Sequence, residues 1–288
     1  MYSENFDYFR PSTVEETIEI LQNNEGAQIL AGGHSLLPAM KLRLTSTSAL
    51  VDIARIEALK GIKSDQGRFE IGAMTTHAEI ARSQLLRDGC AVMADTAANI
   101  GDVQVRNRGT IGGSLAHGDP AADFPTVLLA LSAVIHARGP EWSREIASGD
   151  FCTDMFTTAL GPAEVLTGVS VPELVAGQGA VYLKHHHPAS RYAVVGVAAV
   201  VTLSDGVISQ ARVAVGGVSA FPVRCTEVEM VLVGKNPSAE VYKEAAGHVP
   251  SAIRAPIGDF YASPEFRLHL AEVMTQRALE AAAGKAGA

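Results

Sequence analysis

Two short motifs combine paired glycines with hydroxyl side chains, and their chemistry suits an anion. The first glycine motif reads Ala31-Gly32-Gly33-His34-Ser35, and the second glycine motif reads Thr110-Ile111-Gly112-Gly113-Ser114. Paired glycines let the backbone turn sharply and approach a ligand closely. Successive backbone N–H groups in such a turn form a concave nest that binds anions without a basic side chain. Two motifs that face each other would therefore bind a pyrophosphate, the centre of a dinucleotide cofactor.

Neither motif matches the common nucleotide-binding signatures. The sequence contains no GxxxxGK[ST] run and no GxGxxG within a βαβ unit, which excludes a P-loop and an ordinary Rossmann site. Two alternatives stay open: the glycine pairs are only turns in an interaction subunit, or Ser35 or Ser114 pairs with a neighbouring histidine in a hydrolase. Neither serine lies in a GxSxG elbow. We read the neighbouring histidines, His34 and His117, as residues that position the loops.

The composition is that of a globular protein with one large or two ordinary domains. Of its 288 residues, 47% are apolar and 19% charged, and the 31 acidic against 23 basic residues give a net charge of -8. This acidic balance argues against nucleic acid as a partner. No apolar run reaches the ~20 residues of a membrane-spanning helix, and the N-terminus predicts no signal peptide. The isolated Cys90, Cys152 and Cys225 suit a reducing cytoplasm and form no cluster for iron–sulfur or structural zinc.

The elements around the first glycine motif predict a β-α-β unit. A capping box at Ser12–Glu15 opens a helix that carries Val14, Ile18 and Leu21 on one face. An apolar strand over 27–30 then leads directly into the motif. A basic amphipathic turn or helix over 36–44 and a strand over 49–53 complete this unit.

The elements around the second glycine motif are a longer series of strands and helices. The alternation over 59–73 predicts strands, and Thr76–Glu79 is a capping box that opens a helix toward Leu86. We expect a further helix over 91–100 and a polar stretch over 104–108 that ends in the motif. Beyond the motif, the apolar run over 124–134 predicts a buried helix that passes into a strand.

The last third of the chain has a different composition. Proline and glycine residues punctuate 172–180, and we predict a domain boundary there. Two β-rich runs, 194–203 and 207–215, flank Ser204-Asp205-Gly206, which predicts a hairpin. The apolar spacing over 264–283 predicts a final helix, followed by a frayed end.

Four longer stretches contain these motifs: FDYFRPSTVEE at 6–16, AGGHSLLPAMKLRL at 31–44, QVRNRGTIGGSLAHGDPAADFP at 104–125, and LGPAEVLTGVSVP at 160–172. In these stretches the chain resembles the FAD-binding medium subunit of molybdenum hydroxylases. That family includes carbon monoxide dehydrogenase, quinoline- and nicotinate-type hydroxylases and the flavin domain of xanthine dehydrogenase. The resemblance covers nearly the whole chain and is most specific in the two glycine motifs.

The resemblance implies an α+β fold. A two-lobed FAD-binding domain of the vanillyl-alcohol-oxidase/molybdopterin-dehydrogenase type would occupy 1–176, with lobes at about 1–57 and 58–176. A small C-terminal α+β domain, an antiparallel sheet with helices, would occupy 177–288. FAD would lie in a cleft between these domains.

The resemblance also implies which residues contact FAD. Asp123 would hold cofactor hydroxyls, although it could instead cap the helix that starts at Phe124. Lys184 would lie near the isoalloxazine, where a cation favours the reduced anionic flavin. Tyr192 would lie near the flavin ring, although it could be an ordinary tyrosine at a strand end. The full implied set is Ile29, Leu30, Ala31, Gly32, Gly33, His34, Ser35, Leu36, Ile100, Thr110, Ile111, Gly112, Gly113, Ser114, Asp123, Leu166, Lys184 and Tyr192.

The sequence departs from the family pattern just before Tyr192. Carbon monoxide dehydrogenases usually have a basic and then an acidic residue there, whereas this chain has Arg191 in place of the acid. The preceding His185–His187 triplet would alternate faces in a strand, so at most two of its rings could converge on one ligand. We therefore expect a polar segment at the flavin rim or at an interface, and no metal site on this chain.

The function implied by the resemblance is electron transfer. A large partner subunit would oxidise the substrate at a molybdenum–molybdopterin centre, and a small partner subunit would pass the electrons through [2Fe-2S] clusters. FAD on this chain would then reduce an external acceptor, and no residue of this chain would act on the substrate. The family implies a heterohexamer, a dimer of heterotrimers, in the cytoplasm or peripherally at the inner face of the membrane. The alternative is a stand-alone FAD-dependent oxidoreductase of the same flavin-binding fold.

Overall fold

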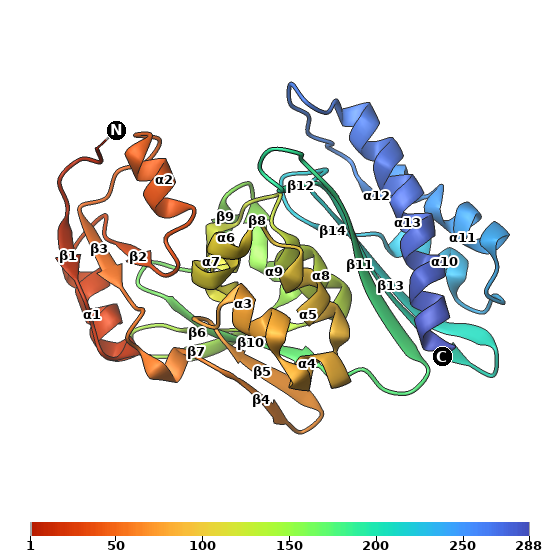
Figure 1. The fold of residues 1–288 in the computed structure, drawn as a ribbon, viewed down its shortest axis with the longest axis horizontal. Coiled ribbons are helices and arrows are strands. Elements are labelled where there is room, and N and C mark those ends of the chain that lie inside the picture. The colour runs from red at the N-terminus through yellow and green to blue at the C-terminus, as the bar shows by residue number, and fades with distance from the viewer. Residues whose placement is uncertain (1, 288) are drawn as a thin grey trace.

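Three main β-sheets, each with its own helices, follow one another along the chain (Figure 1). The computed structural model describes residues 2–287. A 3-stranded parallel sheet comes first, a 5-stranded antiparallel sheet with helices on one face lies in the middle, and a 4-stranded antiparallel sheet backed by a long helix comes last. The structure therefore has the expected α+β class.

The N-terminal sheet contains the predicted β-α-β unit and one strand more. Its strand order is β1-β3-β2. The first helix begins one residue later than predicted, because Thr13 is the N-cap and accepts a hydrogen bond from the Glu16 N–H (3.1 Å). Ser12 and Thr13, like Glu15 and Glu16, are adjacent and alike, so the spacing rule fits both registers. The elements are β1 (Asp7–Phe9), α1 (Val14–Asn23), β2 (Gln28–Leu30), α2 (Leu36–Lys41) and β3 (Ala49–Asp52).

The middle sheet has the strand order β4-β5-β10-β6-β7. The capping box at Thr76 is confirmed, but the helix ends at Arg82 because Ser83 caps a separate helix. The polar stretch before the second glycine motif is helical, which the sequence analysis did not predict. The elements are η1 (Glu57–Leu59), β4 (Ile62–Asp65), β5 (Arg68–Gly72), α3 (His77–Arg82), α4 (Gln84–Gly89), α5 (Ala91–Ala98), α6 (Val103–Arg108), α7 (Ile111–His117), α8 (Asp123–Leu131), β6 (Val134–Arg138), β7 (Ser143–Ala147), α9 (Ser148–Phe151), β8 (Cys152–Asp154), β9 (Thr157–Thr158) and β10 (Val165–Pro172).

The C-terminal sheet contains the predicted hairpin. Its two turn residues, Asp205 and Gly206, have φ of 52° and 79°, the left-handed pair that a tight strand reversal requires. The final helix runs to Ala286, so the prediction of a frayed end is wrong for residues 284–286. Ala288, the last residue of that prediction, lies outside the described residues. The elements are β11 (Gln178–His186), β12 (Ala193–Ser204), β13 (Val207–Gly216), β14 (Val223–Arg224), α10 (Thr226–Leu232), α11 (Ala239–Ala246), α12 (Val249–Ala252) and α13 (Pro264–Ala286).

Helix α8 joins the middle sheet to the C-terminal sheet. All of its residues are buried, and it packs against both β12 and β13. Two paired glycines on these strands leave the necessary space: a Cβ on Gly196 would lie 2.3 Å from the Tyr182 hydroxyl, and one on Gly216 would lie 2.0 Å from Oγ1 of Thr126. The glycines therefore allow α8 and the tyrosine to pack closely against the sheet.

Candidate functional site

The two glycine motifs lie in contact with each other. A Cβ on Gly32 would lie 2.2 Å from the carbonyl oxygen of Arg108 and 2.8 Å from Cα of Gly109. A Cβ on Gly113 would lie 3.4 Å from Cβ of Ala31. Segments almost 80 positions apart therefore meet, and only glycine permits so close an approach at position 32.

The first glycine motif has free hydrogen-bond donors. Within residues 2–287, the backbone N–H groups of residues 32–35 have no acceptor. Gly33 has a φ of +73°, a conformation that favours glycine. Nδ1 of His34 lies 3.0 Å from the carbonyl oxygen of Gly32, which can only accept, so Nδ1 carries the proton. His34 thus closes the motif on itself, as its predicted positioning role requires, and the N–H groups are left for an anion.

The second glycine motif is the first turn of α7, and its N–H groups are used within the chain. Ile111 and Gly112 donate to the carbonyl oxygens of Thr75 (3.1 Å) and Ala73 (2.8 Å). Gly113 donates to the Thr110 hydroxyl (3.1 Å), and Ser114 to the Thr110 carbonyl (3.0 Å). The predicted backbone nest is therefore wrong at this motif, because these bonds satisfy the donors that a helix start leaves open. The Thr110 hydroxyl accepts from Gly113 and keeps its own O–H as a donor, and Ser114 adds a second hydroxyl beside it.

Asp123 and Lys184 form a buried ion pair with Tyr182. Nζ of Lys184 donates to Oδ2 of Asp123 (2.9 Å), and the Tyr182 hydroxyl donates to Oδ1 (2.7 Å). The charged side chains are only 7% and 6% exposed, and the pair joins α8 to β11. Burial raises the pKa of the Asp123 carboxyl, while Lys184 and Tyr182 oppose that rise. Helix α8 begins at Asp123 itself and its N-cap is Ala122, so the alternative in which Asp123 caps a helix that starts at Phe124 is wrong.

Three further predicted residues lie around this ion pair and the motifs. Lys184 also donates to the carbonyl of Asn99 (3.3 Å), which brings Ile100 beside the pair. Burial and the charge of Asp119 raise the pKa of the Tyr192 phenol, and the Ser35 side chain beside it opposes this rise. Tyr192 therefore reaches the first glycine motif from the C-terminal sheet. Leu166 is 5% exposed and packs in the same core cluster as Ile111.

The histidine triplet lies against aromatic side chains. The rings of His185 and Phe266 are 6.4 Å apart, and those of His187 and Tyr261 are 4.5 Å apart. Arg191 has a φ of +60° in the turn that leads to Tyr192. Residues 2–287 contain no group of three or more histidine, cysteine or acidic side chains that could hold a metal ion. The triplet is therefore part of an aromatic surface beside Tyr192.

The sequence analysis missed two residues of this region, His77 and Tyr182. The only sequence signal for His77 was its place in the capping box at Thr76, where we considered the backbone and not the ring. Tyr182 lies two residues before Lys184 and so faces the same side of a strand, which could have suggested a shared partner. Burial and the nearby Asp123 carboxylate raise the pKa of Tyr182 well above its ordinary value, so the phenol donates.

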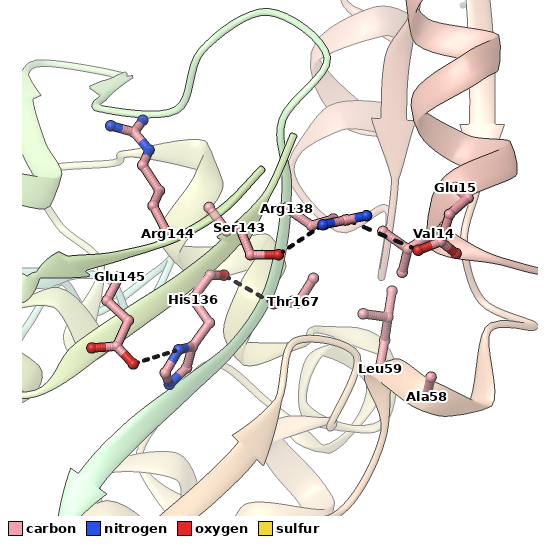
Figure 2. A pocket seen from close by; sticks show the side chains of 11 residues that line it. Val14, Glu15, Ala58, Leu59, His136, Arg138, Ser143, Arg144, Glu145 and Thr167 are labelled. Atoms are coloured by element: carbon pink, nitrogen blue, oxygen red, sulfur yellow. Dashed lines mark hydrogen bonds and ion pairs between the residues drawn. The ribbon is translucent and has the colours of Figure 1, made fainter. Parts of the chain in front are cut away.

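A separate groove of about 680 Å³ lies between the N-terminal lobe and strands β6, β7 and β10 (Figure 2). Several of its polar side chains already have partners: Arg138 lies 3.9 Å from Glu15, His136 lies 3.8 Å from Glu145, and Arg144 pairs with Glu164 outside the groove (2.7 Å). None of the predicted cofactor residues lines it. The free donors of the first glycine motif, rather than this groove, mark the candidate site.

The comparison with known families agrees with this geometry. Residues 4–174 match the FAD binding domain in molybdopterin dehydrogenase, and residues 180–282 match the CO dehydrogenase flavoprotein C-terminal domain. The chain belongs to this molybdopterin dehydrogenase flavoprotein family. The cofactor of the family is therefore FAD, and the free N–H groups of the first glycine motif, held close to the second motif, fit its pyrophosphate.

Relatives of this flavoprotein cover nearly all of it. The chain is 36% identical to the carbon monoxide dehydrogenase medium chain of Afipia carboxidovorans over 98% of both chains. It is 35% identical to the glyceraldehyde dehydrogenase medium chain of Sulfolobus acidocaldarius over 97% of this chain and 99% of the relative. Among solved structures, carbon monoxide dehydrogenase from Hydrogenophaga pseudoflava matches with a TM-score of 0.96 and 35% identity over 99% of both chains.

Two further features of this flavoprotein bear on its surroundings. Over residues 2–287, every helix is too short or too polar to cross a membrane. Cys90, Cys152 and Cys225 are all free thiols. Burial raises the pKa of the Cys90 thiol to about 12, so this thiol stays protonated at neutral pH.

Proposed function

We propose that this chain is the electron-transfer subunit of a molybdenum hydroxylase complex. A large partner subunit with a molybdenum–molybdopterin centre would oxidise the substrate, and a small partner subunit with [2Fe-2S] clusters would deliver the electrons to this chain. An external acceptor would then receive them. This proposal is supported by the carbon monoxide dehydrogenase and glyceraldehyde dehydrogenase relatives, which are both named as medium chains.

The observation that carries the proposal is the row of free N–H groups over residues 32–35, held against the second glycine motif. We propose that these groups bind the pyrophosphate of FAD, and that the Thr110 and Ser114 hydroxyls approach it from the other side. When bound, FAD supplies the redox chemistry, and the protein supplies binding, orientation and electrostatic tuning. The proposed contacts are those of the implied set, at 29–36, 100, 110–114, 123, 166, 184 and 192.

Lys184 and Tyr192 would serve the flavin end of this site. Asp123 and the Asn99 carbonyl hold the Lys184 ammonium in one position, and the third N–H of that ammonium is left for another acceptor. A positive charge fixed in a buried site stabilises added negative charge nearby. We propose that Asp123 contributes by holding Lys184, in addition to any contact with cofactor hydroxyls.

The organisation of the chain follows the same proposal. We propose a two-lobed FAD-binding domain over 1–176, with lobes at 1–57 and 58–176, and a C-terminal domain over 177–288. Two copies of the three-subunit unit would form the complex in the cytoplasm, and peripheral attachment at the inner membrane face is the alternative location. The three free thiols support a reducing compartment.

A visible absorption spectrum of the protein isolated from its native source, combined with a denaturing gel, tests the function. We expect a flavin spectrum with iron–sulfur absorption, and two further bands on the gel, one larger and one smaller than this chain. A flavin spectrum on a lone chain would instead support a stand-alone FAD-dependent oxidoreductase. A colourless protein that does not take up added FAD would overturn the proposed site.

A further inference from the structure

His77 lies directly behind the junction of the two glycine motifs. It is the first residue of α3, and its side chain is buried. Its backbone N–H donates to the carbonyl of Gly109 (2.9 Å), so the start of α3 is fixed to the residue that precedes the second glycine motif. The ring is equally close: a Cβ on Gly109 would lie 2.8 Å from Cδ2 and 2.9 Å from Nε2 of His77.

Gly109 is required by space and not by its backbone conformation. Its φ of -60° and ψ of 138° are values that any residue adopts. One side of Gly109 meets the His77 ring, and its Cα lies 2.8 Å from the position that a Cβ of Gly32 would take. His77, Gly109 and Gly32 therefore form three successive layers without room for a methyl group between them.

The His77 ring is an uncharged, planar group that packs against Gly109. Nδ1 is fully buried without a partner, and Nε2 has no hydrogen-bond partner within residues 2–287. Burial, with a smaller contribution from the Arg106 charge, lowers the pKa of His77 to about 4, so the ring is neutral at ordinary pH. Its other neighbour is the ring of Phe124, with 5.5 Å between the ring centroids. Phe124 adjoins Asp123 on α8, so the His77 ring packs against the helix that carries the buried ion pair.

We propose that His77 is a positioning residue for the cofactor site. Its ring holds Gly109 against Gly32 and so sets the separation between the free N–H groups of the first glycine motif and the start of α7. This inference rests on the proposed FAD site. His77 has no contact of its own with the cofactor in this arrangement, and it acts through Gly109.

A double-mutant cycle in the full-length chain tests the proposal, with FAD affinity measured by quenching of flavin fluorescence. Gly109→Ala forces a methyl group against the ring, and we expect FAD affinity to fall at least ~10-fold, since overpacked sites must shift. His77→Ala removes the support, and we expect a loss of about 5-fold. His77→Ala removes the two nearest atoms that the new methyl group meets and leaves the Val105 carbonyl oxygen at 3.1 Å, so the double variant should bind FAD more tightly than Gly109→Ala alone.

A general loss of stability would change FAD affinity in parallel with the melting temperature, so both are measured for every variant of the cycle. Ile80→Val is the matched control, because Ile80 is fully buried on the same helix and belongs to the same core cluster as Phe124. It should lower the melting temperature without changing FAD affinity. If the double variant binds FAD no better than Gly109→Ala, or if the two losses simply add, the positioning role is wrong.

Two further variants keep the outcomes distinguishable. If His77→Ala does not fold, His77→Asn retains a planar polar group of smaller size and enters the same cycle, with the same rescue expected. Gly33→Val reports on the proposed FAD site itself. Loss of FAD in Gly33→Val without rescue in the cycle overturns only the role of His77, whereas full retention of FAD in Gly33→Val overturns the site on which it rests.

Discussion

The two glycine motifs have similar sequences and different uses. At the first motif, the N–H groups over residues 32–35 have no acceptor within residues 2–287. At the second motif, the carbonyl oxygens of Ala73 and Thr75 and both oxygens of Thr110 accept the corresponding donors. The same contrast applies to Asp123, whose two carboxylate oxygens already accept from Tyr182 and Lys184. A glycine pair or a carboxylate therefore indicates a binding group only where the fold leaves it unpaired.

The largest expected effect is on stability, at Asp123, because both of its carboxylate oxygens accept hydrogen bonds from within the chain. Asp123→Ala leaves the buried Lys184 ammonium without its partner, which costs about 3–5 kcal/mol of unfolding free energy. Urea unfolding with and without saturating FAD measures this loss, which should appear in both conditions. Tyr182→Phe is the control, since it removes one hydrogen bond to the carboxylate and keeps the ion pair, and it should cost about 1.5–3 kcal/mol. Loss of FAD affinity with unchanged stability would instead place Asp123 on the cofactor.

The acid sensitivity of the chain should depend on His77. The pKa of His77 is about 4 in the folded chain against 6.5 in the unfolded chain, so between these values only the unfolded chain binds the proton. Stability therefore rises with pH across this window, and acidification from pH 6.5 to 4 removes about 3 kcal/mol through this ring. Urea unfolding at pH 7 and pH 4.5 should show a smaller pH dependence for His77→Phe than for the natural chain. An equal dependence in both proteins would contradict the burial of a neutral ring.

Gly33→Val tests the first motif as a ligand site. Valine adds a β-branched side chain at a φ of +73°, and even its Cβ would lie 2.9 Å from Cδ1 of Leu37. We expect FAD affinity to fall at least ~100-fold, about 2.7 kcal/mol of binding free energy. The melting temperature without FAD should fall by less than that of Asp123→Ala, because strain at one residue costs roughly 1–3 kcal/mol. A dissociation constant close to that of the natural chain would refute the binding role of the motif.

Gly112→Val is the matched change in the second motif. A Cβ there would lie 2.6 Å from Cβ of Ala73 and 2.7 Å from its carbonyl oxygen. We expect a loss of about 1–3 kcal/mol in unfolding free energy without FAD, as for other overpacked sites. Calorimetry of the FAD-free chain measures it. Unchanged stability together with lost FAD binding would show that the two motifs have the same use after all.

The smallest expected effect is at His34. His34→Ala removes the bond from Nδ1 to the Gly32 carbonyl, a contribution of about 0.5–1.5 kcal/mol. FAD affinity should fall by about 2- to 10-fold, because the ordered motif becomes one of several conformations. Isothermal titration of the FAD-free chain measures this change. His117→Ala is the control, since His117 packs on Phe156 at the far end of α7 and should leave FAD affinity unchanged.

Features that depend on neighbouring residues were predictable from the sequence. The hairpin turn at Asp205, the capping box at Thr76 and the final helix from Pro264 follow from local rules and are confirmed. At the start of α1, spacing could not choose between Ser12 and Thr13, which are adjacent residues of similar capping ability. The break between α3 and α4 was missed because Ser83 caps a second helix within a continuous helical pattern.

Features that depend on distant partners were not predictable. The carbonyls that use the second motif's donors belong to Ala73 and Thr75, more than thirty positions earlier. The phenol that binds Asp123 is 59 positions later, at Tyr182. Local sequence indicates that a group can donate or accept, whereas the tertiary fold decides whether a partner from the same chain reaches it first.

The unpaired N–H groups of residues 32–35 also have a kinetic consequence. Amide protons without an acceptor exchange with solvent deuterium at nearly the rate of an unfolded peptide. The hydrogen-bonded amides of residues 111–114 exchange only after the local structure opens and breaks those bonds. An anion seated on the first motif would slow its exchange and leave the second motif almost unchanged. The deuterium uptake of a peptide with residues 32–35 would therefore report how much of the site is occupied, and the uptake of a peptide with residues 111–114 would serve as the internal reference. One mass spectrum of the two peptides would give the occupied fraction.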